Sequence, residues 1–242
     1  VTDIAFAPRG LGLQLATVSG DGYVRIYKPD DAHNLEFWHE QSFEASSSDA
    51  SSSGGGDADE ASAKRSRQLT SISWCEAHFC PPMLAVAAKD GSIRVWAFNE
   101  AFERWQVMHR LQGHTGAVHD ISWAPDTGRS YHLLASASSD GCLGVWAVVK
   151  SGETGGALPG AADGTERARS PDGKVSRCMM KANAHGGKEV WRVQWDISGM
   201  QLATSGDDRN VRLWRKKLQG MQFECFEEVS MDFRVNEVEP ED

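Results

Sequence analysis

The chain has 242 residues, of which 40% are hydrophobic, so the sequence can form a sizeable core. Its formal net charge of −9 argues against a nucleic-acid-binding surface, and it lacks an apolar run long enough to span a membrane. Five scattered cysteines do not suggest a disulfide framework and favour a reducing compartment. The sequence opens at Val1 in mid-strand without a visible secretory signal, and we expect natural N-terminal residues to be missing.

In chain order, the strand-like segments form one unit that occurs four times. Each unit has an alternating strand with an aromatic residue at or near its end, then a small-residue strand, then a turn aspartate six residues before another aromatic residue. The turn aspartates and their aromatic partners are Asp21 and Tyr27, Asp90 and Trp96, Asp140 and Trp146, and Asp208 and Trp214. Short strands, Gly- and Asp-rich turns and the lack of a long helical period predict an all-β fold.

Two polar segments, residues 44–68 and 151–173, interrupt the repeats and contain few large apolar side chains. Such segments cannot order themselves by burial, so we predict that both are disordered insertions. The repeats then form a single domain over residues 1–230, followed by an acidic tail at 231–242. The four blades of this domain are expected at about residues 1–43, 69–110, 115–182 and 187–230.

Two short clusters resemble chemical sites. Adjacent carboxylates such as Asp207 and Asp208 suggest acid/base catalysis. However, Asp208 is the repeated turn residue, and other residue types fill the Asp207 slot in the other copies, so a turn is the favoured interpretation. Cys75, His78 and Cys80 suggest zinc, but no fourth ligand lies close in sequence, which favours a plain loop. We therefore predict no catalytic residue, no metal site and no cofactor.

The units resemble WD repeats, through Gly113-His114 and through the aspartate-to-aromatic spacing. In that family a histidine, a Ser or Thr, the turn aspartate and the tryptophan form a hydrogen-bonded chain, because buried Trp and His need partners. The resemblance implies two such networks, His114, Ser136, Asp140 and Trp146 in the third copy, and His185, Thr204, Asp208 and Trp214 in the fourth. We expect Asp140 to be the acceptor of both His114 and Trp146.

The first two copies depart from the pattern. Tyr27 replaces the tryptophan in the first copy, and Val86 replaces the Ser or Thr in the second. Neither copy has a matching Gly-His pair. We expect these two blades to depend more on apolar packing.

A closer resemblance covers nearly all the repeat region. Segments such as GRSYHLLA and SGDDRNVRLW are similar to the Seh-type WD-repeat nucleoporins, scaffold proteins of the Y-shaped nuclear pore subcomplex. The resemblance implies a six-bladed open propeller, of which four blades are visible here, with a helical-solenoid nucleoporin donating a further blade. It also implies a place at the nuclear envelope, a role in nucleocytoplasmic transport, and a second role in TOR regulation at the vacuolar or lysosomal membrane.

Three alternatives stay open at this point. The small WD-repeat subunit of the COPII vesicle coat is a close relative of the same family. A peptide-binding WD-repeat adaptor would need exposed basic or aromatic residues near the channel. An enzyme is disfavoured, because the chain has no nucleophile elbow, phosphate loop or metalloprotease motif. The sequence assigns no partner-contact residue.

Overall fold

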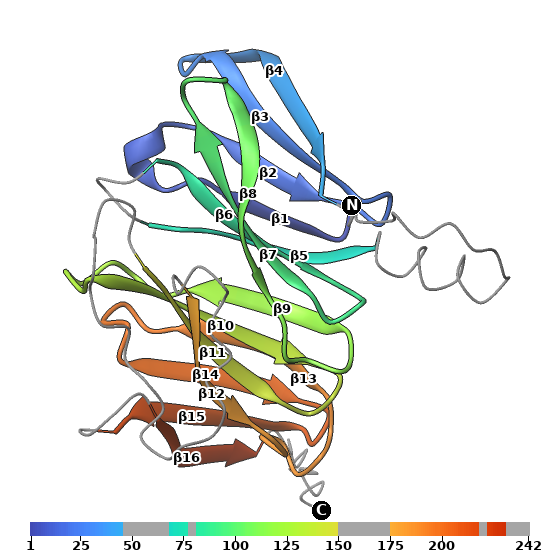
Figure 1. Ribbon diagram of the computed structural model, residues 1–242, viewed down its shortest axis with the longest axis vertical. Coiled ribbons are helices and arrows are strands. Elements are labelled where there is room, and N and C mark those ends of the chain that lie inside the picture. The colour runs from blue at the N-terminus through green and yellow to red at the C-terminus, as the bar shows by residue number, and fades with distance from the viewer. Residues whose placement is uncertain (46–67, 77–80, 150–174, 218–221, 231–242) are drawn as a thin grey trace, which may run out of the picture.

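The computed structural model describes residues 1–45, 68–76, 81–149, 175–217 and 222–230. These residues form four antiparallel sheets of four strands each, and consecutive strands of a sheet are hydrogen-bonded neighbours (Figure 1). The prediction of an all-β propeller with four visible blades is confirmed. The insertions and the acidic tail predicted from sequence lie almost entirely outside the described residues. The described chain includes no helix long and apolar enough to cross a membrane.

Within each sheet the strands are arranged in the order in which they occur in the sequence. The first contains β1 (Asp3–Phe6), β2 (Leu15–Val18), β3 (Tyr23–Asp31) and β4 (Asn34–Glu44), with a short 3₁₀ turn, η1 (Arg9–Leu11), after β1. The second contains β5 (Leu69–Trp74), β6 (Met83–Ala88), β7 (Ile93–Asn99) and β8 (Arg104–Leu111). The third contains β9 (Val118–Trp123), β10 (Tyr131–Ser138), β11 (Leu143–Val149) and β12 (Val175–Lys181). The fourth contains β13 (Val190–Trp195), β14 (Gln201–Gly206), β15 (Asn210–Lys216) and β16 (Phe223–Ser230).

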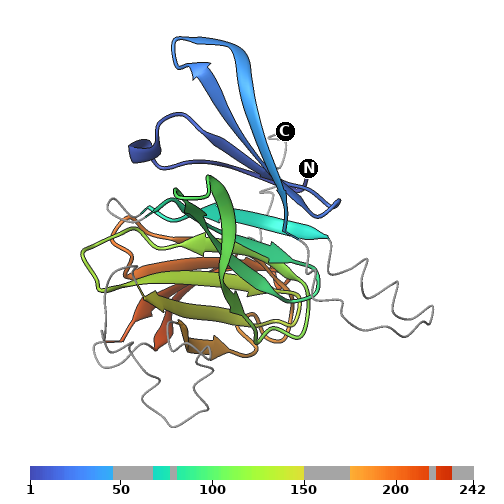
Figure 2. The same cartoon turned by 45° about the horizontal axis from the view of Figure 1, so that its top comes forward.

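The first strands of successive sheets lie side by side and form the inner wall of the array. Asp3 Oδ2 of β1 accepts the backbone N–H of Ile72 in β5 at 2.9 Å. Asp120 Oδ2 of β9 accepts the backbone N–H of Val193 in β13 at 3.0 Å. From these inner strands each sheet extends outward like a blade, and the turned view shows the first sheet leaning away from the other three (Figure 2).

The core lies between neighbouring sheets rather than inside any one of them. The middle strand β6 reads MLAVAA and is buried along its whole length, because sheets lie on both of its faces. Leu143 and Val145 of the third sheet belong to one buried cluster with Trp195 and Leu202 of the fourth. Each sheet is therefore stable only with neighbours, as expected for a repeat whose apolar face must be covered by the next copy.

Tryptophans near the ends of the inner strands connect each sheet to the preceding one. Trp74 Nε1–H donates to the carbonyl of Ala5 at 3.1 Å, and Trp195 Nε1–H donates to the carbonyl of Ser122 at 2.9 Å. The equivalent Trp123 has a buried Nε1 without an acceptor among the described residues. The tryptophan that ends the inner strand of the second, third and fourth sheets is thus a packing element between blades.

Candidate functional site

The third sheet brings together the four residues expected from the repeat. The ring of His114 is buried, with Nε2 2.8 Å from Ser136 Oγ and Nδ1 3.1 Å from Asp140 Oδ2. Trp146 Nε1–H donates to Ser136 Oγ at 3.0 Å. The expectation that Asp140 accepts from Trp146 is wrong, because Ser136 lies between them and is the shared partner of the indole and the imidazole.

The fourth sheet repeats this arrangement with a threonine in place of the serine. His185 Nε2 lies 2.8 Å from Thr204 Oγ1, and its Nδ1 lies 2.7 Å from Asp208 Oδ1. Trp214 Nε1–H donates to Thr204 Oγ1 at 2.8 Å. In both sheets the hydrogen-bonded network runs from the largely buried turn aspartate through the histidine to the hydroxyl and the buried indole.

The turn aspartates of these two sheets, Asp140 and Asp208, have lowered pKa values, which favours their charged form. Burial alone would raise the pKa of Asp140, but hydrogen bonds from His114 and from the backbone N–H of Thr115 bring that pKa well below its usual value. Burial likewise acts to raise the pKa of Asp208, and His185 and the backbone N–H of Asn210 outweigh it and lower the pKa. A carboxylate in this setting acts as a fixed acceptor rather than as a proton-transfer group.

The carboxylates of the adjacent Asp207 and Asp208 have different partners. Asp208 bonds to His185 inside the blade, whereas Asp207 Oδ1 accepts the indole N–H of Trp191 at 2.7 Å on the surface. Of the suggested zinc cluster, Cys75 is buried, and residues 77–80, which include the other two candidates, lie outside the described residues. Within the described residues no group of three His, Cys, Asp or Glu is arranged to hold a metal ion.

The second sheet lacks the network, as its sequence implied. Val86 offers no hydroxyl, and the buried Trp96 Nε1 has no acceptor among the described residues. Asp90 instead lies 3.6 Å from the guanidinium of Arg94, which also donates to the carbonyl of Ala45 at 2.8 Å. In this blade the turn aspartate therefore has a buried arginine as its partner.

An ion pair within the turn was missed by the sequence analysis. An arginine four residues after the turn aspartate contacts it in three sheets. The pairs are Asp21–Arg25 at 2.8 Å, Asp90–Arg94 at 3.6 Å and Asp208–Arg212 at 3.2 Å. The repeated D-x-x-x-R spacing in the sequence could have predicted these ion pairs. The third sheet has Gly144 at this position, where a Cβ would lie only 2.5 Å from Ser136 Oγ.

A second polar network, also missed, joins three inner strands. Ser71 Oγ lies 2.8 Å from Asp3 Oδ2 and 3.0 Å from Asp120 Oδ1. Burial raises the pKa of Asp120, although the backbone N–H of Val193 and the hydroxyl of Ser71 act in the opposite direction. One serine hydroxyl thus links the first, second and third sheets at the inner wall.

The first sheet presents an apolar face that its counterparts bury. Ile4 and Phe6 are 57% and 68% exposed. The residues at the same two positions in the other three inner strands are only 3–6% exposed, because they pack on the preceding sheet; they are Ile72, Trp74, Ile121, Trp123, Val193 and Trp195. The array is also open at its other end, where Val211 and Leu213 are only partly buried, unlike their counterparts in the other sheets. Exposed apolar faces of this kind mark protein interaction sites.

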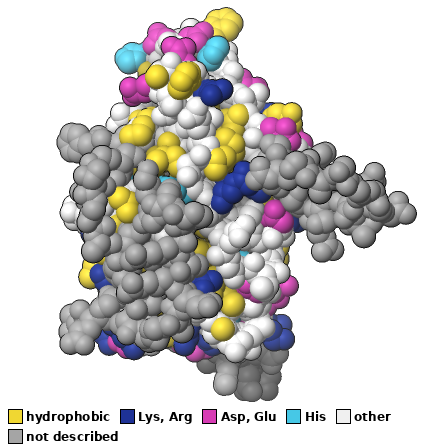
Figure 3. Space-filling view, in the orientation of Figure 1, with side chains coloured by type: hydrophobic (Ala, Val, Ile, Leu, Met, Phe, Trp, Pro, Cys, Tyr) yellow, Lys and Arg dark blue, Asp and Glu magenta, His cyan; other side chains and the backbone are white. Residues whose placement is uncertain are grey.

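Hydrophobic side chains also reach the surface on the outer strands. In the space-filling view they gather over the upper part of the molecule, where the first and second sheets lie (Figure 3). Leu35 and Phe37 of the long β3–β4 hairpin are 53% and 66% exposed, and Phe102 in the β7–β8 turn is 65% exposed. The outer rim therefore adds apolar area beside the open first sheet.

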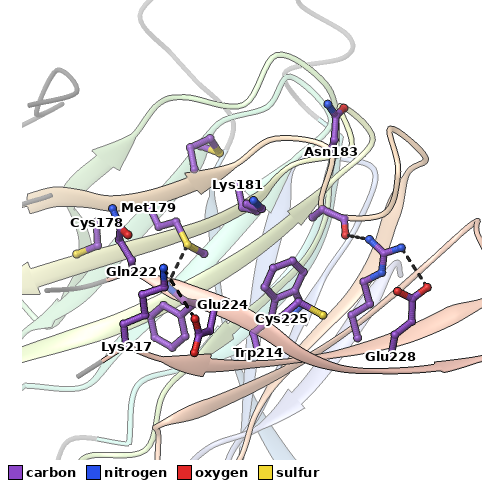
Figure 4. A pocket seen from close by; sticks show the side chains of 14 residues that line it. Cys178, Met179, Lys181, Asn183, Trp214, Lys217, Gln222, Glu224, Cys225 and Glu228 are labelled. Carbon is purple, nitrogen blue, oxygen red and sulfur yellow. Dashed lines mark hydrogen bonds and ion pairs between the residues drawn. The ribbon is translucent and has the colours of Figure 1, made fainter. Parts of the chain in front are cut away.

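A groove of about 670 Å³ lies between the outer strand of the third sheet and the last strands of the fourth (Figure 4). Met179, Trp214 and Phe223 contribute its apolar lining, and the backbone N–H of Phe223 donates to Met179 Sδ at 3.4 Å. Four of its charged groups form two ion pairs within the chain, Arg212–Glu228 at 3.2 Å and Lys217–Glu224 at 3.8 Å. Its described lining residues come from the third and fourth sheets, so the groove is a surface between two blades.

Comparison with known proteins agrees with this architecture. The family model described as "WD domain, G-beta repeat" matches residues 105–147 and 176–215. Each match runs from the outer strand of one sheet through the first three strands of the next, so the sequence repeat and the structural blade are offset by one strand. The chain therefore contains two matched WD repeats, and its described residues form sheets of the β-propeller kind.

The chain is also similar to curated nucleoporins of the SEH1 type. The chain is 34% identical to "Nucleoporin SEH1" of Homo sapiens over 225 residues, covering 89% of this chain and 53% of the relative. It is 33% identical to "Nucleoporin SEH1-A" of Xenopus laevis over 228 residues, with the same coverage of 89% and 53%. The chain thus spans about half the length of the curated relatives it matches.

Proposed function

We propose that this chain is part of a non-enzymatic scaffold subunit of the nuclear pore complex, with a role in nucleocytoplasmic transport at the nuclear envelope. The names of its homologues support this proposal. The structural observation that carries it is the open first sheet, where Ile4 and Phe6 are exposed although their counterparts are buried. A surface that covers this face would bury Ile4 and Phe6 as their counterparts are buried.

The covering surface is best supplied by further β-sheet. Sheet-on-sheet packing already buries the equivalent positions three times within the chain. Covering one large apolar side chain stabilises a complex by about 1.5–3 kcal/mol, so Ile4 and Phe6 together supply a substantial driving force. We propose that additional blades complete the ring and that a helical-solenoid nucleoporin donates one of them, since open sheets take up strands from partners.

Affinity purification of the tagged gene product from its own cells, with mass spectrometry of stoichiometric partners, tests this function. Recovery of helical-solenoid nucleoporins is the expected result. Recovery of the rod-forming partner of the COPII coat would instead place the protein in vesicle budding. Many short-motif clients without a stoichiometric partner would make it a peptide-binding adaptor.

Two variants test whether the partner binds at the open face of the first sheet. The double substitution Ile4→Ser and Phe6→Ser should reduce recovery of the stoichiometric partners at least about tenfold, since about 1.4 kcal/mol corresponds to tenfold in affinity. Ile197→Ser is the matched control, because Ile197 is 94% exposed in a turn of the fourth sheet. Equal recovery from both variants would show that the first sheet is not the surface that holds the assembly together.

A further inference from the structure

Three inner strands carry a β-bulge at the same point. The pairing register shifts between Leu69 and Ser71 in β5 and between Val190 and Arg192 in β13, and the pairing of β9 with β10 skips His119 in the same way. The extra residues are Thr70, His119 and Trp191. A bulge redirects the side chain of the extra residue, and bulges recur at the rims of closed sheets beside functional sites.

In the third and fourth sheets the bulge residues form an aromatic stack. The rings of His119 and Trp191 are parallel within 17° and their centroids are 4.0 Å apart. Trp191 nevertheless stays 45% exposed, because His119 covers only one side of the indole. The repeat itself does not require an aromatic residue here, since the second sheet has Thr70. The stack is therefore an addition to the propeller framework.

Two carboxylates hold the stack in place. Trp191 Nε1–H donates to Asp207 Oδ1 at 2.7 Å, and His119 Nε2 lies 2.9 Å from Glu189 Oε2. Asp207 and Glu189 are themselves neighbours, because the backbone N–H of Asp207 donates to the carbonyl of Glu189 at 3.0 Å. The second oxygens, Asp207 Oδ2 and Glu189 Oε1, have no hydrogen-bond partner among the described residues. They are open acceptors beside an open aromatic surface.

Arg192, the cation that follows Trp191 in the chain, does not neutralise this site. Arg192 follows Trp191 on β13, is 73% exposed and is directed toward Asp120, with a separation of 4.0 Å between Nη1 and Oδ1. The long-range field of the whole chain, with a net charge of −9, attracts cations toward the surface.

We propose that Trp191, His119, Asp207 and Glu189 form a docking site for an arginine side chain of a protein partner. A guanidinium is planar, stacks on aromatic rings and presents five N–H donors in a fixed fork. It can lie on the open side of the indole while donating to the free carboxylate oxygens. A lysine ammonium is a point charge without a flat face, so it fits the same site less well. The site is separate from the open face of the first sheet and does not depend on the proposed scaffold role.

Nuclear magnetic resonance of the ¹⁵N-labelled chain tests the site with a defined probe. The probe is the peptide acetyl-Gly-Arg-Gly-amide, titrated to about 10 mM because single-residue sites bind weakly. The indole N–H signal of Trp191, assigned by its loss in Trp191→Thr, should shift and saturate. The same peptide with citrulline in place of arginine has the shape without the charge and should cause no shift.

Two variants make the result specific. Asp207→Asn keeps an acceptor for Trp191 but removes the charge, and should weaken the arginine peptide at least about tenfold, or about 1.4 kcal/mol. Ile197→Ser, exposed in the same sheet, should leave binding unchanged. The other indole signals report whether each variant is folded, and Trp191→Thr carries the residue type that the second sheet tolerates. Absence of a saturable shift, an equal shift with citrulline, or undiminished binding in Asp207→Asn would each overturn the proposal.

Discussion

Removal of one buried hydroxyl tests the hydrogen-bonded chain of the third sheet. Ser136 is fully buried, and its Oγ serves both Trp146 Nε1–H and His114 Nε2. In Ser136→Ala both ring nitrogens lose their partner in a site that is closed to water. Each unsatisfied buried polar group costs about 1–3 kcal/mol, so we expect a loss of about 2–4 kcal/mol in the free energy of unfolding. A domain of this kind is stable by only about 5–15 kcal/mol, so the loss should be large enough to measure easily.

Equilibrium unfolding in urea, followed by tryptophan fluorescence, measures this change. Ser205→Ala is the matched control, because Ser205 is a partly exposed serine near the end of β14 and takes no part in either network. Thr204→Val in the fourth sheet removes the equivalent hydroxyl with almost no change in shape and should reproduce the effect of Ser136→Ala. A cost below about 0.5 kcal/mol for Ser136→Ala, similar to that of an ordinary surface substitution, would refute the role of the shared hydroxyl.

Three further predictions use the same readout. Gly144→Ala places a Cβ 2.5 Å from Ser136 Oγ and should cost about 1–3 kcal/mol of stability through overpacking, whereas an alanine at the exposed Gly20, with nothing within 4 Å, should cost far less. Val86→Thr offers an acceptor to the unpartnered Trp96 Nε1 and should be neutral or stabilising by up to about 1 kcal/mol; a clear destabilisation would contradict the equivalence of the blades. Asp140 and Asp208 have lowered pKa values in the folded protein. Their charged forms therefore contribute fully to stability above the unfolded pKa of about 3.9, and this contribution is lost as the pH falls through the folded pKa values. Unfolding at a series of pH values should therefore show a steep loss below about pH 4 that is smaller in Asp140→Asn, and an unchanged slope in that variant would refute the assignment.

Local spacing explains why much of the fold was predictable. A turn aspartate and an aromatic residue six positions later fix one hairpin, so Asp140 and Trp146 could be located from the sequence alone. The histidine and the hydroxyl lie within the same repeat and follow from the family pattern. The repeat did not reveal that Ser136 rather than Asp140 accepts from Trp146, because that choice depends on side-chain direction in the folded sheet.

Contacts between blades were harder to predict. Asp3, Ser71 and Asp120 are far apart in the sequence and meet only because their strands line one inner wall. The stack of His119 on Trp191 depends on two bulges, which leave no local signature in the alternation of apolar and polar residues. The exposure of Phe6 likewise follows from the arrangement of whole sheets, since the segment VTDIAF looks like the other inner strands.

The most direct test of the scaffold account is the accessibility of position 6 in the purified assembly. Phe6→Cys places a thiol on the open face of the first sheet, and the exposed Cys225 provides an internal reference for full labelling. With a thiol reagent and site-resolved mass spectrometry, we predict rapid labelling of position 6 in the isolated 242-residue chain and strong protection in the assembly recovered from cells. Equal labelling of positions 6 and 225 in that assembly would contradict the claim that another sheet covers this face.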